Sequence, residues 1–148
     1  MEKINLNAYK VNAKKAYDSK EFTVCNYIGI ERCKHDSQAY NKASDADNGK
    51  MAISVKSDGF SLMAGSLCAG LTDFNSIWNL FEANVHSDSF WYVTNDFQAY
   101  AMSIVEFKEF VYNFCGLAKE SAKNGGTVKI RARHESKKMV AWLDAKIA

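Results

Sequence analysis

The sequence contains no proline, no Ser/Gly-rich linker, no low-complexity run and no repeat at the period of a solenoid protein. Features of this kind separate domains or build extended arrays, so their absence predicts one domain that spans residues 1–148. A chain of this length can bury a hydrophobic core of its own.

Long apolar runs are missing too. No segment is long enough to cross a bilayer, and the opening residues MEKINLNAYK lack the apolar core of a signal peptide. These absences predict a cytoplasmic protein without a membrane partner. The four cysteines show neither CxxC pairing nor zinc-ligand spacing, which favours reduced thiols over a set of disulfides.

The sequence also lacks a strong excess of one charge, because 19 Lys and Arg residues against 17 Asp and Glu residues leave a net charge of +2. Net charge alone therefore does not indicate a polyanionic partner. No P-loop, Rossmann fingerprint, HExxH or GxSxG motif is present, so the chemistry that these motifs mark has no support in the chain.

What the chain does contain is 47% hydrophobic residues in periodic segments. Spacing of three and four predicts a helix over residues 72–85, and Ser103 with Glu106 forms a capping box that opens another helix over 103–117. Further helices are expected over 4–19, 19–33 (where a strand remains an alternative) and 135–147, and strands over 89–94, 98–103 and 127–133. This order predicts an α/β (α+β) fold, a mixed β-sheet flanked by helices. The tryptophans at 78, 91 and 142 are expected in its core.

The segment SDADNGKMAISVKS contains the strongest hairpin signal, because the type I′ turn favours Asn48-Gly49 at its centre. Counting from that turn pairs Asp47 with Lys50, Ala46 with Met51 and Asp45 with Ala52. One face then carries the polar side chains, toward solvent, while the other face is apolar. The polar face is predicted to hold Asp45, Asp47, Lys50, Ala52, Ser54 and Lys56.

This polar face has two interpretations. An ordinary solvated hairpin is rich in Asp and Lys. Alternatively, a carboxylate beside a lysine can hold a divalent cation and leave an ammonium group to orient water or stabilise a charged transition state. The face count alone favours the first interpretation.

The hairpin, an aspartate followed by a turn and a strand that ends in Ser54-Val55-Lys56, resembles the core of the PD-(D/E)XK nuclease superfamily over about residues 19–62. The resemblance implies a restriction-endonuclease-like fold and a metal-dependent DNA endonuclease that uses Mg²⁺ or Mn²⁺. It matches Asp45 to the metal-binding aspartate, Lys56 to the catalytic lysine and Glu21 to the helix glutamate. Enzymes of this kind often act as homodimers, although no residue pattern marks an interface here.

The chain departs from the superfamily pattern at Ser54, which stands where an acidic residue is usual. A serine hydroxyl is a poor ligand for a hard cation. Either Glu21, Asp47 or Asp36 supplies the missing carboxylate, or the domain is a catalytically inactive DNA- or protein-binding module. The catalytic set under the first alternative is Asp45, Ser54, Lys56 and Glu21, with Asp45, Glu21 and Asp47 as metal ligands.

A basic strand is the second candidate for binding DNA. In TVKIRAR, the residues Lys129, Arg131 and Arg133 share one face, and a polyanion would relieve their mutual repulsion. A solvated edge strand is the alternative. Three further residues are expected as phosphate contacts: His35, Lys137 and Lys138.

Overall fold

The computed structural model describes residues 1–31, 45–47, 51–62, 70–119 and 128–148. The strands are β1 (Glu2–Asn5), β2 (Ala46–Asp47), β3 (Ala52–Lys56), β4 (Ser61–Leu62), β5 (Ser89–Val93), β6 (Gln98–Met102), β7 (Cys115–Lys119) and β8 (Val128–Ala132). The helices are α1 (Ala16–Ile28), α3 (Phe74–Asn84), α4 (Ile104–Phe114) and α5 (Ser136–Ile147), with a 3₁₀ turn at Asn7–Tyr9.

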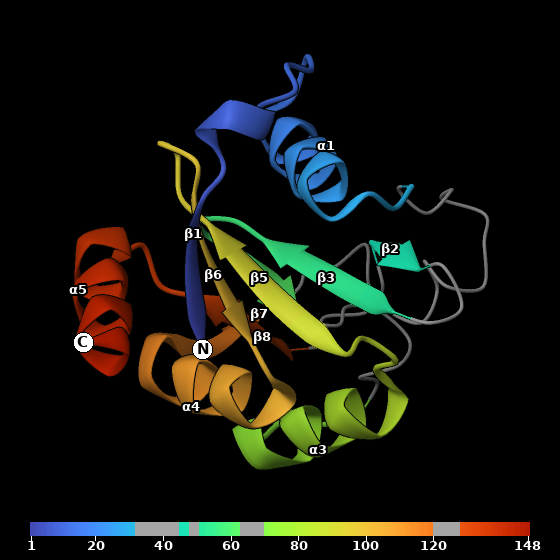
Figure 1. The fold of residues 1–148 in the computed structure, drawn as a ribbon. Helices are drawn as coiled ribbons and strands as arrows, with labels where there is room; N and C mark the ends of the chain where they lie inside the picture. The colour runs from blue at the N-terminus through green and yellow to red at the C-terminus, as the bar shows by residue number, and fades with distance from the viewer. Residues whose placement is uncertain (32–44, 48–50, 63–69, 120–127) are drawn as a thin grey trace.

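These strands form two sheets. A five-stranded sheet has the order β1-β6-β5-β3-β2, and a three-stranded sheet, here called the small sheet, has the order β4-β8-β7. The pairing of β3 with β5 is parallel, whereas the other pairings of described strands are antiparallel. The expected mixed sheet flanked by helices is therefore confirmed (Figure 1).

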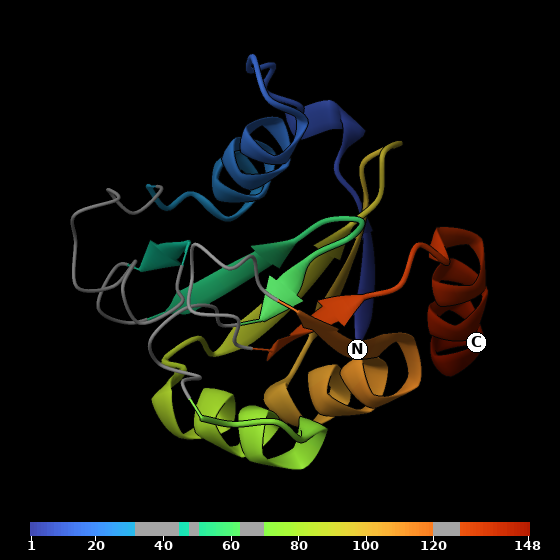
Figure 2. The ribbon, with the colours of Figure 1, turned by 180° about the vertical axis from the view of Figure 1, so that it is seen from behind.

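The two faces of the large sheet are covered differently. Helix α1 lies over one face, where Val24 and Cys25 pack with Ile53, Val55 and Trp91 (Figure 1). The helices α3, α4 and α5 and the small sheet enclose the other face, and Figure 2 shows the small sheet from behind. The domain therefore has two hydrophobic cores with the large sheet between them.

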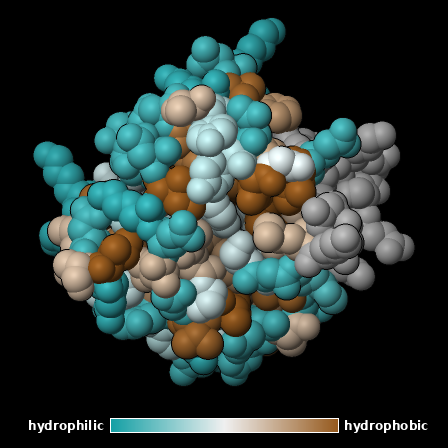
Figure 3. Space-filling view, in the orientation of Figure 1, coloured by the Kyte–Doolittle hydropathy of each residue, from teal (hydrophilic) through white to brown (hydrophobic). Residues whose placement is uncertain are grey.

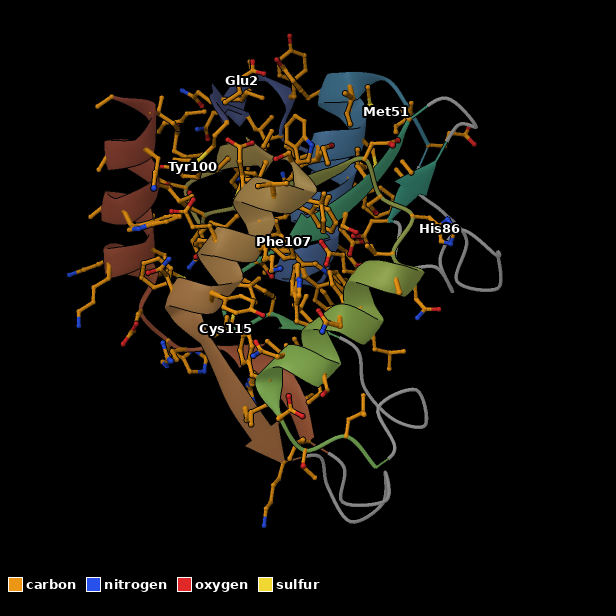
Figure 4. All side chains as sticks on the ribbon, turned by 90° about the horizontal axis from the view of Figure 1, so that it is seen from below. Glu2, Met51, His86, Tyr100, Phe107 and Cys115 are labelled. Atoms are coloured by element: carbon orange, nitrogen blue, oxygen red, sulfur yellow. The ribbon has the colours of Figure 1, made fainter. Side chains whose placement is uncertain are left out.

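Aromatic rings dominate the core beneath α4. Phe107 is fully buried and stacks on Phe90 of β5 with ring centroids 4.4 Å apart, and it lies at the centre of the side chains in Figure 4. Trp78 and Trp91 are buried and Trp142 packs against the same core as α4, which confirms the expected positions of the tryptophans. Hydrophilic residues cover much of the molecular face in Figure 3, with smaller apolar patches between them.

Local capping chemistry sets two helix starts, and the sequence analysis predicts the second of them. The side chain of Asp73 accepts a hydrogen bond from the backbone N–H of Ser76 at the start of α3. The Ser103–Glu106 capping box is present at α4. Helix α1 ends at Gly29, whose φ of 79° suits a residue without a side chain. None of the helices in the described ranges is long and apolar enough to cross a membrane.

The helix predicted over residues 4–19 is wrong in its first part. Residues Glu2–Asn5 form β1, which pairs antiparallel with β6, and α1 begins only at Ala16. Ile4 and Leu6 are buried two residues apart, which is the strand period, and β6 offers their backbone a hydrogen-bonding edge. The helix predicted over 103–117 ends earlier, at Phe114, and Cys115–Lys119 form β7 because they pair with β8.

The stacked aromatic core leads to a stability prediction. Phe107→Ala removes a fully buried ring and is expected to lower the free energy of unfolding by about 3–5 kcal/mol. Val105→Ala, in the same helix at a side chain that is 75% exposed, is expected to change it by less than about 0.5 kcal/mol. Urea denaturation followed by circular dichroism measures both values, and equal losses would contradict the assigned core.

Candidate functional site

The hairpin forms with a different register from the predicted one. Ala46 pairs with Ile53 and Asp47 with Ala52, so each partner lies two residues further along β3 than the count from Asn48-Gly49 predicts. The reason is burial, because this register places fully buried Ala46 opposite fully buried Ile53 instead of opposite Met51, which is 42% exposed. A shift of two residues keeps each side chain on its predicted face. The turn residues 48–50 lie outside the described residues.

The sequence predicts that the polar face of β3 points to solvent, and this prediction is wrong. Ser54 is fully buried, and its hydroxyl lies 2.8 Å from the hydroxyl of Ser87. In the parallel register, Ser54 and Lys56 neighbour Phe90 and Tyr92 of β5, on the side that the small sheet and α4 enclose. The second layer of the fold therefore covers a face that looks solvent-exposed in the sequence.

Asp45 lies beside β3 and forms hydrogen bonds with the backbone of two β3 residues. Its backbone N–H donates to the carbonyl of Ile53 at 2.7 Å, and its Oδ2 accepts from the backbone N–H of Val55 at 2.6 Å. The side chain thus replaces the next residue that a longer β2 would have provided. One carboxylate oxygen is committed to the backbone, which leaves the other for a further interaction.

Lys56 follows directly at the end of β3 and is partly buried. Burial lowers the pKa of its ammonium group, and the negative charges of Asp45 and Glu21 raise it in part, so that the pKa remains below its ordinary value. The fold therefore brings Glu21 of α1, Asp45 and Lys56 within electrostatic range of one another. A lysine of this kind is a common feature of functional sites.

The structure says less about the other predicted metal ligands. The backbone of Asp47 pairs with Ala52 in the hairpin, and Asp36 lies outside the described residues. His35, which is predicted as a phosphate contact, lies outside them too. Within the described ranges, no three His, Cys, Asp or Glu side chains are grouped so that they could hold a metal ion. The two described cysteines, Cys25 and Cys115, are buried.

The basic strand has the predicted alternation. Ile130 and Ala132 are buried, while Arg131 and Arg133 are exposed and Lys129 is partly exposed. Strand β8 is the middle strand of the small sheet and not an edge, because β4 and β7 pair on its two sides. Two further predicted contacts, Lys137 and Lys138, are exposed in the first turn of α5.

Sequence reasoning missed a polar network that connects the two ends of the chain. The hydroxyl of Tyr100 donates to Oδ1 of Asp144 at 2.6 Å, and the Lys3 ammonium group lies 2.9 Å from the same oxygen (Tyr100 is labelled in Figure 4). Both hydrogen bonds hold the pKa of Asp144 below its ordinary value. No local pattern reveals this contact, since Lys3 and Asp144 are 141 residues apart.

This network predicts a pH effect on stability. A carboxyl group whose pKa is lowered by folding stabilises the fold above its unfolded pKa, and the contribution is lost as pH falls through the folded value. The stability difference between the wild type and Asp144→Asn should therefore be present at pH 7 and shrink below about pH 4. Urea denaturation at several pH values measures it, with Glu82→Gln as an exposed control. A difference that grows in acid would contradict the network.

Comparison with known proteins identifies no relative of this chain. No protein-family model, no curated protein and no solved structure matches the chain. The geometry of the described residues is therefore the basis for inferring its function.

Proposed function

We propose that this protein is a DNA-binding module that acts through the basic face, defined as the side of the small sheet that carries Lys129, Arg131 and Arg133. The observation that supports the proposal is that Arg131 in β8 and Arg133, which follows the end of β8, are both exposed. Neither of them forms an ion pair with another residue in the described part of the chain.

Small neighbours leave this face open. Gly116 and Ala118 of β7 pair with Arg131 and Lys129, so no large side chain covers the cations from that side. On the other side, β4 places Ser61 opposite Arg131. A hollow of about 320 Å³ lies along β7 and β8, and Gly116, Leu117, Ala118, Arg131, Ala132, Arg133 and His134 line it. A phosphate backbone could approach the guanidinium groups there.

The guanidinium group of Arg133 is held in position. Its Nη1 donates to the carbonyl of Asn113 at 3.2 Å, and its Nε lies 3.7 Å from where a Cβ on Gly116 would be. That distance is an ordinary van der Waals contact, so the Arg133 side chain passes directly over Gly116. One hydrogen bond to the protein leaves further N–H groups of the guanidinium for phosphate oxygens.

DNA binding without cleavage is favoured because two residues of the predicted metal site already form hydrogen bonds within the protein. Ser54, which stands in the position of an acidic ligand, is buried and bonded to Ser87. One oxygen of Asp45 is used by the backbone of Val55. These donors do not fit a divalent cation well, because Mg²⁺ prefers several carboxylate or water oxygens in near-octahedral geometry.

A metal-dependent DNA endonuclease remains a second candidate because of one observation. Lys56 is partly buried in the electrostatic field of Asp45 and Glu21, the three residues that the PD-(D/E)XK resemblance selects. Mg²⁺ or Mn²⁺ would supply charge stabilisation at the scissile phosphate in such an enzyme. Residues outside the described ranges, including Asp36, would then have to complete the ligands.

The binding proposal predicts salt-dependent affinity for duplex DNA. Arg131→Gln and Arg133→Gln should each weaken binding and should each reduce the slope of log K against log salt by about 1, because each removes one phosphate contact. Fluorescence anisotropy with a labelled duplex, in EDTA, measures both effects. Lys14→Gln, at an exposed lysine that is not on the basic face, is the control of equal charge change. Absence of binding at low salt, or unchanged slopes in both arginine variants, would contradict the proposal.

The endonuclease candidate predicts cleavage of plasmid DNA with Mg²⁺ or Mn²⁺ and none with EDTA. Asp45→Asn keeps an oxygen for the N–H of Val55 and removes the charge, while Lys56→Ala removes the ammonium group. Each variant should abolish cleavage, by about 100-fold or more, and Glu82→Gln should not. Gel electrophoresis measures the products. Cleavage that survives in both variants would exclude this site, and DNA binding without any cleavage would leave the binding module.

A further inference from the structure

A cavity of about 480 Å³ lies apart from the basic face, where the carboxyl ends of β3 and β5 meet the first turn of α5. Its lining includes Asp58, Tyr92, Asn95, Gln98, Ser136 and Lys137. Ligands of α/β proteins commonly bind outside the carboxyl ends of parallel strands, and β3 and β5 are paired in parallel. The volume is in the range of small-molecule sites.

Tyr92 contributes a polar atom to this cavity that the fold itself does not use. The residue is 1% exposed, and its hydroxyl forms no hydrogen bond with another residue in the described ranges. Burial and the nearby charge of Asp58 raise the pKa of Tyr92 to about 12, so the hydroxyl keeps its proton at neutral pH. Tyr92 lines the cavity, so its hydroxyl can donate to a ligand or to water there.

The start of α5 adds an anion-binding end. The helix has 12 residues, and its N-cap residue, Glu135, makes no side-chain capping hydrogen bond. The first N–H groups of a helix have no partner within the helix and carry partial positive charge. Ser136 and Lys137 belong to this turn and line the cavity, so backbone donors and an ammonium group lie together there. Phosphate groups bind well at such positions.

The lining of the cavity also includes groups that could bind the hydroxyl groups of a ligand. Asp58 is exposed and accepts no hydrogen bond from a described residue, so its carboxylate can accept from hydroxyl groups. The Oδ1 of Asn95 already accepts from the buried Lys20 ammonium group at 2.8 Å, which leaves the amide N–H groups of Asn95 for a ligand.

The walls of the cavity are preformed. The turn between β5 and β6 is closed by hydrogen bonds from Thr94 to Asp96 and from the N–H of Gln98 to Thr94. Phe97 in the same turn has a φ of 60° and is buried, a left-handed conformation that persists when surrounding contacts determine it. A ligand would therefore meet groups that already have fixed positions.

We propose that this cavity binds a small phosphorylated polyol, with its phosphate at the start of α5 and Lys137, and its hydroxyl groups at Tyr92, Asp58 and Asn95. The site uses none of Lys129, Arg131 and Arg133, so it does not depend on the DNA-binding proposal.

Ribose 5-phosphate is the probe, with ribose and inorganic phosphate as its separate parts. Isothermal titration calorimetry should show that ribose 5-phosphate binds more tightly than either part. Tyr92→Phe and Lys137→Gln should each weaken binding about tenfold, because each removes one hydrogen-bonding or charged partner. Tyr92→Phe should not lower the thermal midpoint, since no hydrogen bond within the described protein is lost, so weaker binding cannot be attributed to misfolding.

Matched variants separate this site from the basic face. Lys14→Gln, with the same charge change as Lys137→Gln, and Arg131→Gln should both retain the affinity of the wild type for ribose 5-phosphate. The proposal is overturned if ribose 5-phosphate does not bind at millimolar concentration, or if Tyr92→Phe and Lys137→Gln bind it as the wild type does. It is also overturned if inorganic phosphate alone binds as tightly, since the polyol contacts would then contribute nothing.

Discussion

Strand β5 is buried along both of its faces, and the positions of its neighbours follow from that burial. Phe90 and Tyr92 point to the core that α4 and the small sheet enclose, whereas Trp91 and Val93 point to the core beneath α1. The strand pairs with β3 in parallel on one side and with β6 in antiparallel on the other. A parallel pair requires a crossover connection, and the chain between β3 and β5 provides it with β4 and α3. The small sheet is therefore brought against the large one as a consequence of this pairing.

The parallel pair also determines where polar groups accumulate. Because β3 and β5 run in the same direction, the segments that follow them leave the sheet at one end, and Asp58 and Asn95 both line the cavity there. Lys56 closes β3 at the same end, beside Tyr92 in the register. The electrostatic environment of Lys56 and the proposed polyol site thus have a common structural origin. The basic face, in contrast, depends on the small sheet alone.

Much of the secondary structure follows from local chemistry and can be predicted from the sequence. Asp73 and Ser103 cap helices through hydrogen bonds to residues within one turn, so the signal and the structure lie in the same few residues. The alternation of Ile130 and Ala132 with Arg131 is likewise a local property of β8. Strand β1 could not be predicted in this way, because the edge of β6 that makes it a strand is far away in the chain.

The features of the candidate site also differ in whether the local sequence or the tertiary packing determines them. The sequence by itself determined that the side chains of Asp45, Ser54 and Lys56 belong to one face of the hairpin, since strand alternation depends only on parity. Only the tertiary structure decided that this face is covered, that Ser54 bonds to Ser87, and that the hairpin register brings Ala46 to Ile53. It also decided that Tyr92, Asp58 and the start of α5 surround one cavity. The physical reason is that burial and electrostatic coupling depend on distances through space, which packing between segments far apart in the chain sets.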